Sequence, residues 1–431
     1  PDTAAATEPF EVTVRVSVPA ATPTEPPLRL GGDIPELADG VMMVPDRLDP
    51  TLWSATVTVD TPTQARIWFD RGSDSTTSTD RHQVELTYPG QTVDLWVSAW
   101  QDMDGGIEPR PGFITGIYTT DWTAPQTFAT VPATYRRIGA HNGGWVVVSS
   151  VAQYGQTQPL PQVELRPMRV AAAALPSYDI ERHAALAGDA GLSVILGTQI
   201  NMEMSPGGLD AVCSPQADGW WQAWLDEAEE VWMLHAAAAA DAGIEAMVLP
   251  GHCFHVFPWE GHMGNPEVEA AFDQRVAAMI DEVRQVCPGR LIVSGSAPQF
   301  DFPALADLVG VTTYDTGHRD LPYNATVEEW TAAYDTLFAD TVDPRWERWH
   351  RPVLFYTVHV PPHPDDQDPA SGAVQARQLE AIFRAIEARP WVTGVLSWSY
   401  DWVDYPLASS DGVRARLAEA VLAKHYAMLG G

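Results

Sequence analysis

Two kinds of hydrophobic pattern divide this chain. Between residues 9 and 100, apolar and polar residues alternate with a period of two, as in Phe10-Glu-Val-Thr-Val-Arg-Val-Ser-Val, which is typical of half-buried strands. The further alternating runs are Trp53–Val59, Ala65–Phe69, Gln83–Leu86 and Val93–Val97. Short strands divided by Pro, Gly, Asp and Ser turns predict an immunoglobulin-like β-sandwich over residues 1–105. We expect its strand tryptophans to be core residues: Trp53, Trp68, Trp96 and Trp100.

A different pattern follows the Gly- and Pro-rich residues 103–112. Short apolar runs now alternate with long amphipathic runs such as Trp220–Gly243, Val268–Val286 and Ala373–Ala388. The expected strands are Phe113–Tyr118, Trp145–Ser149, Leu192–Thr198, Ala246–Gly251, Leu291–Gly295, Leu308–Tyr314, Val353–Val358 and Val392–Ser397. Eight strand–helix units predict a (β/α)8 TIM barrel over residues 112–431. A doubly wound sheet, the competing topology, is expected to carry a Gly-rich phosphate turn that this sequence lacks.

Length, composition and net charge limit the possible classes of protein. At 431 residues, 45% of them hydrophobic, the chain is long enough for a barrel and a smaller domain. A net charge of −32 argues against nucleic acid as a partner, because phosphates would be repelled. No uninterrupted apolar run reaches the roughly 18 residues of a membrane span, so none is expected.

The start at Pro1 and the cysteines bear on localisation. A chain that begins without Met and has a small, polar, Pro-rich lead suits an exported protein whose signal has been removed, or a chain trimmed at its start. We adopt the first interpretation and expect a secreted or extracytoplasmic location. In that setting Cys213 and Cys253 are candidates for a disulfide, whereas Cys287, late in a predicted helix, is expected to be buried.

Side chains suited to a carbohydrate site follow the predicted strands. In a barrel these positions share one rim, where rings can stack on sugars and carboxyl groups can act as acid, base or nucleophile. The catalytic candidates are Asp315, Glu203, Glu260, Asp401 and Asp121. The substrate-binding candidates are His252, Tyr314, His318, Tyr356, His359, Trp398, Trp402 and Trp259. The remaining rim residues are Trp122, Tyr154, Asn201, His255, Ser296, Asp301, Thr357, Tyr400 and Asp404.

The N-terminal residues resemble a known family of modules. Leu30-Gly-Gly-Asp-Ile-Pro-Glu-Leu, Leu52-Trp-Ser-Ala-Thr-Val, Phe69-Asp-Arg-Gly-Ser and Val97-Ser-Ala-Trp-Gln-Asp102 are similar to starch- and glycogen-binding immunoglobulin-like modules. Those modules usually place a Trp soon after the Gly-Asp and Arg-Gly-Ser segments, where this chain has Asp33-Ile-Pro and Asp74-Ser-Thr. The resemblance therefore implies a structural or inactive sugar module.

The second half resembles the clan A glycoside hydrolases, and among them the β-mannanase-like TIM barrels. The motifs are Trp220-Trp221-Gln-Ala-Trp224, Ala240-Asp-Ala-Gly-Ile-Glu-Ala-Met-Val-Leu, Val309-Gly-Val-Thr-Thr-Tyr314, Arg351-Pro-Val-Leu-Phe and Val392-Thr-Gly-Val-Leu-Ser-Trp398, in this order. The resemblance implies a Glu acid/base after strand four and a Glu nucleophile after strand seven. Here His252 and Thr357 stand at those positions, so the retaining two-Glu mechanism does not carry over.

Three hypotheses follow. The site hydrolyses a glycan through other rim carboxylates, foremost Asp315 with Glu203 or Glu260. Alternatively, His252, His255, His318 and His359 gather around zinc, although their spacing matches no helical metalloprotease motif. In the third hypothesis the barrel binds a glycan and has lost catalysis. We adopt the first and expect a carbohydrate partner, no cofactor and no metal.

Overall fold

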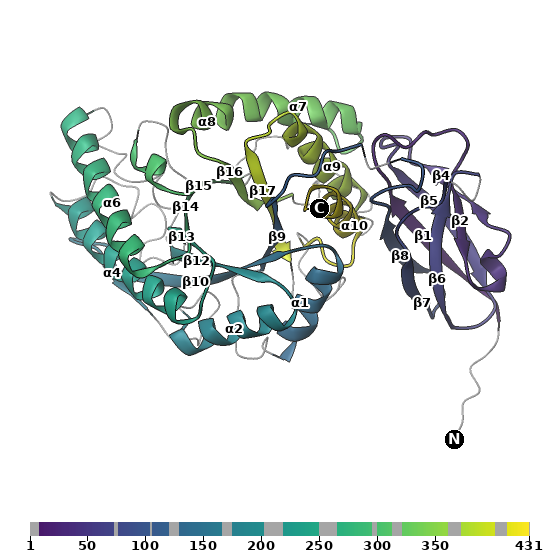
Figure 1. Ribbon diagram of the computed structural model, residues 1–431, viewed down its shortest axis with the longest axis horizontal. Helices are drawn as coiled ribbons and strands as arrows, with labels where there is room; N and C mark the ends of the chain where they lie inside the picture. The colour runs from purple at the N-terminus through teal and green to yellow at the C-terminus, as the bar shows by residue number, and fades with distance from the viewer. Residues whose placement is uncertain are drawn as a thin grey trace, which may run out of the picture.

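The structure is a computed structural model (Figure 1). It describes residues 8–72, 76–103, 106–119, 129–165, 175–201, 219–249, 265–294, 300–312, 321–360, 372–400 and 412–430, without the side chains of Asn201 and Ser399.

Two four-stranded sheets form the N-terminal unit. The first has the order β4 (Val44–Pro45), β5 (Leu52–Val59), β1 (Phe10–Ser17), β8 (Gln91–Trp96), and the second β3 (Val41–Met42), β2 (Arg29–Gly32), β6 (Thr63–Asp70), β7 (His82–Leu86). The 3-10 helix η1 (Pro35–Leu37) follows β2. Val14 of one sheet and Phe69 of the other belong to the same buried cluster, so the sheets share a core.

The tryptophan prediction for this unit is half right. Trp53 and Trp100 are buried in the shared core. Trp68 and Trp96 are only half-buried, and the prediction that they are core residues is wrong. Trp96 lies on β8 between the inward-facing Leu95 and Val97, so strand alternation turns its ring to the outer face of the sheet. Aromatic character alone does not reveal which face of a strand is covered.

Eight parallel strands close into a barrel. Their order is β10 (Trp145–Gln156), β12 (Ser193–Asn201), β13 (Ala246–Leu249), β14 (Arg290–Ser294), β15 (Leu308–Thr312), β16 (Val353–Val358), β17 (Val392–Tyr400), β9 (Ile114–Thr119). The ring closes because β9 also pairs in parallel with β10. A short β11 (Gln162–Glu164) pairs antiparallel with the extended end of β10. Closure confirms the TIM-barrel prediction and excludes the doubly wound sheet.

Helices surround this ring. They are α1 (Val131–Ala140), α2 (Ser177–Asp189), α4 (Trp220–Asp241), α6 (Pro266–Val286), α7 (Val327–Thr341), α8 (Asp343–Trp349), α9 (Ala373–Glu387) and α10 (Leu417–Gly430). One connection departs from the expected repeat: between β14 and β15, the described residues 300–307 hold only the 3-10 helix η4 (Phe302–Leu305). No helix of the described residues is long and apolar enough to cross a membrane.

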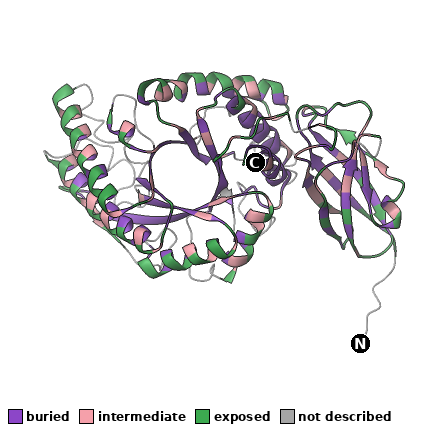
Figure 2. Cartoon of the chain, in the orientation of Figure 1, coloured by how far each residue is buried: buried purple, intermediate pink, exposed green. Residues whose placement is uncertain are grey.

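Local sequence explains where the helices begin. The Asn265 side chain accepts hydrogen bonds from the amides of Glu267 and Val268, and Pro266 fits the first turn of α6. At α7, Thr326 and Glu329 form a reciprocal capping box. Apolar residues at helical spacing on α6 then pack against the barrel, which leaves the polar face outward (Figure 2).

A buried ion cluster joins the N-terminal unit to the barrel. Lys424 of α10 is the only lysine in the chain. Its Nζ donates to the Val18 carbonyl of the N-terminal unit at 3.0 Å and to Glu380 Oε2 of α9 at 2.7 Å, and both charged side chains are fully buried. This position explains why α9 and α10 are buried on nearly every side, unlike the outer helices (Figure 2).

The neighbouring groups set the charge state of this cluster. Burial alone would raise the pKa of Glu380, but Lys424 and His425 hold it well below its ordinary value. Burial lowers the pKa of His425 to about 4, so the neutral ring donates from Nε2 to the Glu380 carboxylate at 2.8 Å. Burial, with Glu380 nearby, raises the pKa of Asp49 in the adjoining loop to about 6. Arg384 of α9 also binds Glu380, at 3.0 Å, so the junction is organised around one buried carboxylate paired with two cations.

Replacing Lys424 with Met should destabilise the protein strongly. The variant leaves the Glu380 carboxylate buried without its ammonium partner, a change that costs about 3–5 kcal/mol in other proteins. The exposed pair Arg348–Asp301 supplies the matched control, because Arg348→Met should cost less than about 1 kcal/mol. Urea unfolding at pH 7 measures both, and equal losses in the two variants would contradict this description of the junction.

Candidate functional site

The inner face of the barrel has two different ends. At the starts of the strands, Trp145 lies beneath the Arg290 guanidinium, whose carbon is 5.0 Å from the ring centroid. A middle layer is aliphatic, with Ile195, Ile292 and Leu354 in one buried cluster. Towards the carboxyl ends, the inner residues become aromatic and polar. Function in such barrels is located at the carboxyl end, so this is the candidate site.

Five side chains, which we call the mouth cluster, form this layer: Tyr118, Ser149, Gln199, Tyr356 and Trp398. The Tyr118 ring lies 5.3 Å from that of Tyr356 and 4.4 Å from that of Trp398, between centroids. Tyr118 Oη is 3.0 Å from Ser149 Oγ, and the Gln199 amide donates to the same hydroxyl. Tyr118, Ser149 and Tyr356 are buried, whereas Gln199 and Trp398 are half-buried.

The mouth cluster contains side chains of the types that contact sugars. A half-buried indole offers a face on which the C–H side of a pyranose can stack, and an amide offers both a donor and an acceptor to hydroxyl groups. The Tyr118 hydroxyl fixes Gln199 from below, so the amide is held in place before a ligand arrives.

A glycine makes room for one of these rings. A Cβ atom at Gly197 of β12 would lie 2.7 Å from Tyr356 Oη and 3.2 Å from a methyl group of Val147. Since real Cβ atoms do not approach other atoms so closely, the Tyr356 ring occupies its position because residue 197 has no side chain.

The structure describes three of the predicted site residues. Tyr356 and Trp398 lie in the mouth cluster, and His359, half-buried, follows the end of β16. The predictions for His252, Trp259, Tyr314, His318, Trp402, Asp121, Glu203, Glu260, Asp315 and Asp401 fall outside the described residues. So do Trp122, His255, Ser296, Asp404 and the pair Cys213–Cys253. Cys287 is buried, as predicted.

Three further rim predictions are wrong. Tyr154 points away from the mouth, and its hydroxyl accepts a hydrogen bond from Trp224 Nε1 of α4 at 2.7 Å. The Tyr400 hydroxyl is buried against Glu419 of α10. Asp301 is exposed and binds Arg348 of α8 at 2.7 Å. The first two errors arise because the residue after an expected strand end still belongs to a longer strand, whose alternation decides the direction of the side chain.

Three members of the mouth cluster are absent from the sequence-based site. Tyr118, Ser149 and Gln199 lie within strands, whereas the expected rim begins after them. A usable signal is present only for Tyr118, a large polar residue at the inward parity of β9, whose other inward residues are Ile114 and Gly116. Thr357, at the position where the clan A resemblance expects a Glu, is buried with 1% exposure.

The metal hypothesis gains no support from the described residues, among which no three His, Cys, Asp or Glu side chains lie close enough to hold an ion. Three of its four histidines fall outside them.

No protein-family model and no curated protein sequence matches this chain. Several solved structures share its fold. The GH113 β-mannanase AaManA from Alicyclobacillus acidocaldarius, in complex with ManMIm, is 20% identical with a TM-score of 0.55, over 73% of this chain and 97% of the mannanase. A GH113 β-1,4-mannanase is 18% identical with a TM-score of 0.55, over 73% and 99%.

A third solved structure matches more of the chain. A β-D-glucuronidase from Dictyoglomus thermophilum is 10% identical with a TM-score of 0.50, over 94% of this chain and 64% of its own. A match that covers 94% of this chain must include most of the residues of the two N-terminal sheets. At these identities the similarity establishes a shared fold, the closed barrel of parallel strands, and not a shared activity.

Gly197→Ala should disturb the mouth cluster selectively. The added methyl group forces the Tyr356 ring to move, and overpacking of this kind costs about 1–3 kcal/mol. Gly188→Ala in α2 is the control, since its Cβ meets nothing within 4 Å and a helical Ala is favoured by about 0.5–1 kcal/mol. Thermal unfolding compares them. A Gly197→Ala protein as stable as Gly188→Ala would refute the packing described for Tyr356.

Proposed function

We propose that this protein acts on a poly- or oligosaccharide bound at the barrel mouth, and that it hydrolyses glycosidic bonds there. The observation that carries the proposal is the mouth cluster, in which the half-buried Trp398 lies beside Tyr118 and Gln199 at the carboxyl ends of the strands. The barrel fold shared with the two mannanases supports the choice of a glycan ligand.

The acid and base of this proposal come from the segments after the strands, because the eight barrel strands contain no Asp or Glu. Asp401 follows Tyr400 directly, Glu203 stands two residues after Asn201, and Asp315 three after Thr312. Asp121 stands two residues after Thr119, and Glu260 is farther from its strand. Asp315 with Glu203 or Glu260 remains our proposed pair, and all five carboxylates fall outside the described residues.

A non-catalytic glycan-binding barrel is the second candidate. It is favoured by the end of β16, where Thr357, next to Tyr356, stands at the position at which the resemblance places a Glu nucleophile. Neither side chain is a carboxylate, so the loss of the two-Glu mechanism is part of this proposal. Binding without product distinguishes it from the hydrolase.

The rest of the molecule is interpreted on the same basis. We propose that residues 1–105 form an immunoglobulin-like sandwich similar to a carbohydrate-binding module, that residues 112–431 form the barrel domain, and that the protein is exported. The two sheets with a common core support the first point.

A panel of polysaccharides assayed for new reducing ends tests the hydrolase. We expect product from at least one member of the panel, and a rate lowered by about 100-fold or more in Asp315→Asn or Glu203→Gln, because acid–base groups contribute about 10²–10⁴. Asp301→Asn is the matched carboxylate control, since Asp301 binds Arg348 outside the mouth. Binding without product supports the second candidate, and neither binding nor product would refute both.

Trp398→Ala should weaken glycan binding by about two- to tenfold, because one aromatic contact contributes about 0.5–1.5 kcal/mol. Trp346→Ala is the control: Trp346 of α8 is also half-buried and stacks on Trp391 at 5.6 Å, outside the barrel. Calorimetric titration with β-1,4-mannohexaose measures both variants. An unchanged affinity in Trp398→Ala would argue against the mouth as the binding site.

A further inference from the structure

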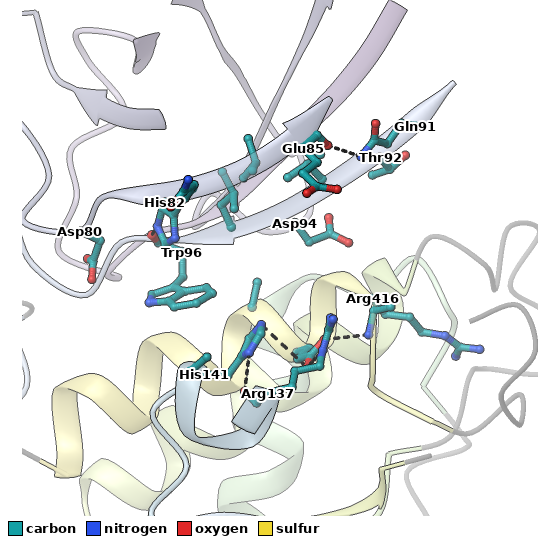
Figure 3. A pocket seen from close by; sticks show the side chains of 18 of the residues that line it. Asp80, His82, Glu85, Gln91, Thr92, Asp94, Trp96, Arg137, His141 and Arg416 are labelled. Carbon is teal, nitrogen blue, oxygen red and sulfur yellow. Dashed lines mark hydrogen bonds and ion pairs between the residues drawn. The ribbon is translucent and has the colours of Figure 1, made fainter. Parts of the chain in front are cut away.

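A hollow lies between the N-terminal unit and the barrel (Figure 3). We call it the junction cleft. The edge strands β7 and β8 form one wall, and the end of α1 and the start of α10 form the other. Its volume is about 750 Å³, within the range of roughly 300–1,000 Å³ that is usual for ligand pockets. The cleft is separate from the mouth cluster, with which it shares no lining residue.

One indole ring, that of Trp96, is part of the cleft lining. Trp96 extends from β8 towards the barrel, and its ring centroid lies 4.6 Å from that of His82 and 5.0 Å from that of His141 (Figure 3). The two imidazoles therefore hold the ring from the two walls. Trp96 remains half-buried. A Trp that is turned away from its own core and fixed by neighbouring rings has a defined position before a ligand arrives, and the exposed part of its ring is available for contact.

The charges around Trp96 are largely compensated. On the sheet wall, Asp94 binds Arg15 through two contacts of 2.5 and 2.7 Å. On the barrel wall, Glu419 binds Arg137 at 2.7 and 2.8 Å. The other charged residues of the lining are Asp80 and Glu85 with Arg81 and Arg416, two of each sign, so the formal charges around the cleft balance and do not favour a highly charged ligand.

Exposed polar groups line the same space. Gln83, Glu85 and Thr92 are exposed and belong to the cleft wall. Amide, carboxylate and hydroxyl groups beside an aromatic ring are complementary to a ligand with hydroxyl groups at its edge and C–H groups on its face.

We propose that the junction cleft is a second binding site, for a short neutral oligosaccharide stacked on Trp96. The class of ligand rests on the proposed function, because a protein that acts on glycans meets such chains. A site at the junction would hold the substrate polymer next to the barrel and raise its local concentration at the mouth.

Titrations of the full chain with β-1,4-mannohexaose, cellohexaose and maltoheptaose test the cleft. The Trp398→Ala protein serves as the background, because it weakens the mouth. We expect it to retain binding of at least one of these sugars, and expect that binding to fall at least tenfold when Trp96→Ala or Thr92→Arg is added. Thr92→Arg fills the cleft from an exposed position and so does not depend on removal of the ring. Tyr88→Ala is the control, because Tyr88 is an exposed aromatic residue of the same unit outside the cleft. This substitution should leave the affinity for the sugar unchanged.

The outcomes separate the two sites. If Trp398→Ala removes all binding, or if the residual binding survives both cleft substitutions, the cleft proposal is overturned and the mouth proposal stands. If binding depends on the cleft residues and is unaffected by Trp398→Ala, the cleft stands and the mouth is overturned. If the wild-type protein binds none of the three sugars, both are overturned.

Discussion

The fixed volume inside the closed barrel is the constraint on which the candidate site depends. The interior of an eight-stranded barrel holds only side chains that fit together. On four of the strands, a glycine leaves space for a neighbouring group. A Cβ at Gly116, Gly197, Gly310 or Gly394 would lie 2.4–2.8 Å from the nearest atom. At Gly197 the nearest atom is the Tyr356 hydroxyl, so the Tyr356 ring can point inward because this position has no side chain. At the other three glycines, backbone and small or aliphatic side-chain atoms of neighbouring strands occupy the space. The mouth cluster is thus a consequence of interior packing, and its orientation is settled before any ligand is present.

The junction imposes a second constraint. The Lys424–Glu380 pair is buried between α9, α10 and the N-terminal unit, and Val327 of α7 donates its amide to the Leu48 carbonyl at 3.0 Å. Leu52 of β5 even belongs to the core cluster of the barrel. These contacts hold β7 and β8 opposite α1 and α10, which creates the junction cleft. A buried ion pair is a poor source of stability but selects one arrangement over others, because a shifted junction would leave a charge unpaired.

Sequence periodicity predicted the architecture well, for a physical reason. The barrel strands are buried on both faces and read as continuous apolar runs, so each expected strand overlaps an observed one, and α6 and α9 follow from their amphipathic spacing. The direction of individual side chains was harder to predict. β10 extends to Gln156, past the expected end at Ser149, and this places Tyr154 on the outer face. Likewise, nothing in the pattern of β8 reveals that a neighbouring unit lies opposite Trp96, since that contact joins residues far apart in the chain.

The resemblance to clan A hydrolases predicted the fold of the barrel but not the residues of the mouth cluster. The cluster of Tyr118, Ser149 and Gln199 forms only when three separate strands lie side by side in the barrel. No single sequence motif contains all three residues. The proposed function requires that a glycan binds against this cluster. A crystal structure of the full chain soaked with β-1,4-mannohexaose tests this binding directly. We expect a pyranose ring stacked on Trp398 within hydrogen-bond distance of Gln199, and an unoccupied mouth in crystals saturated with the sugar would refute the proposed binding site.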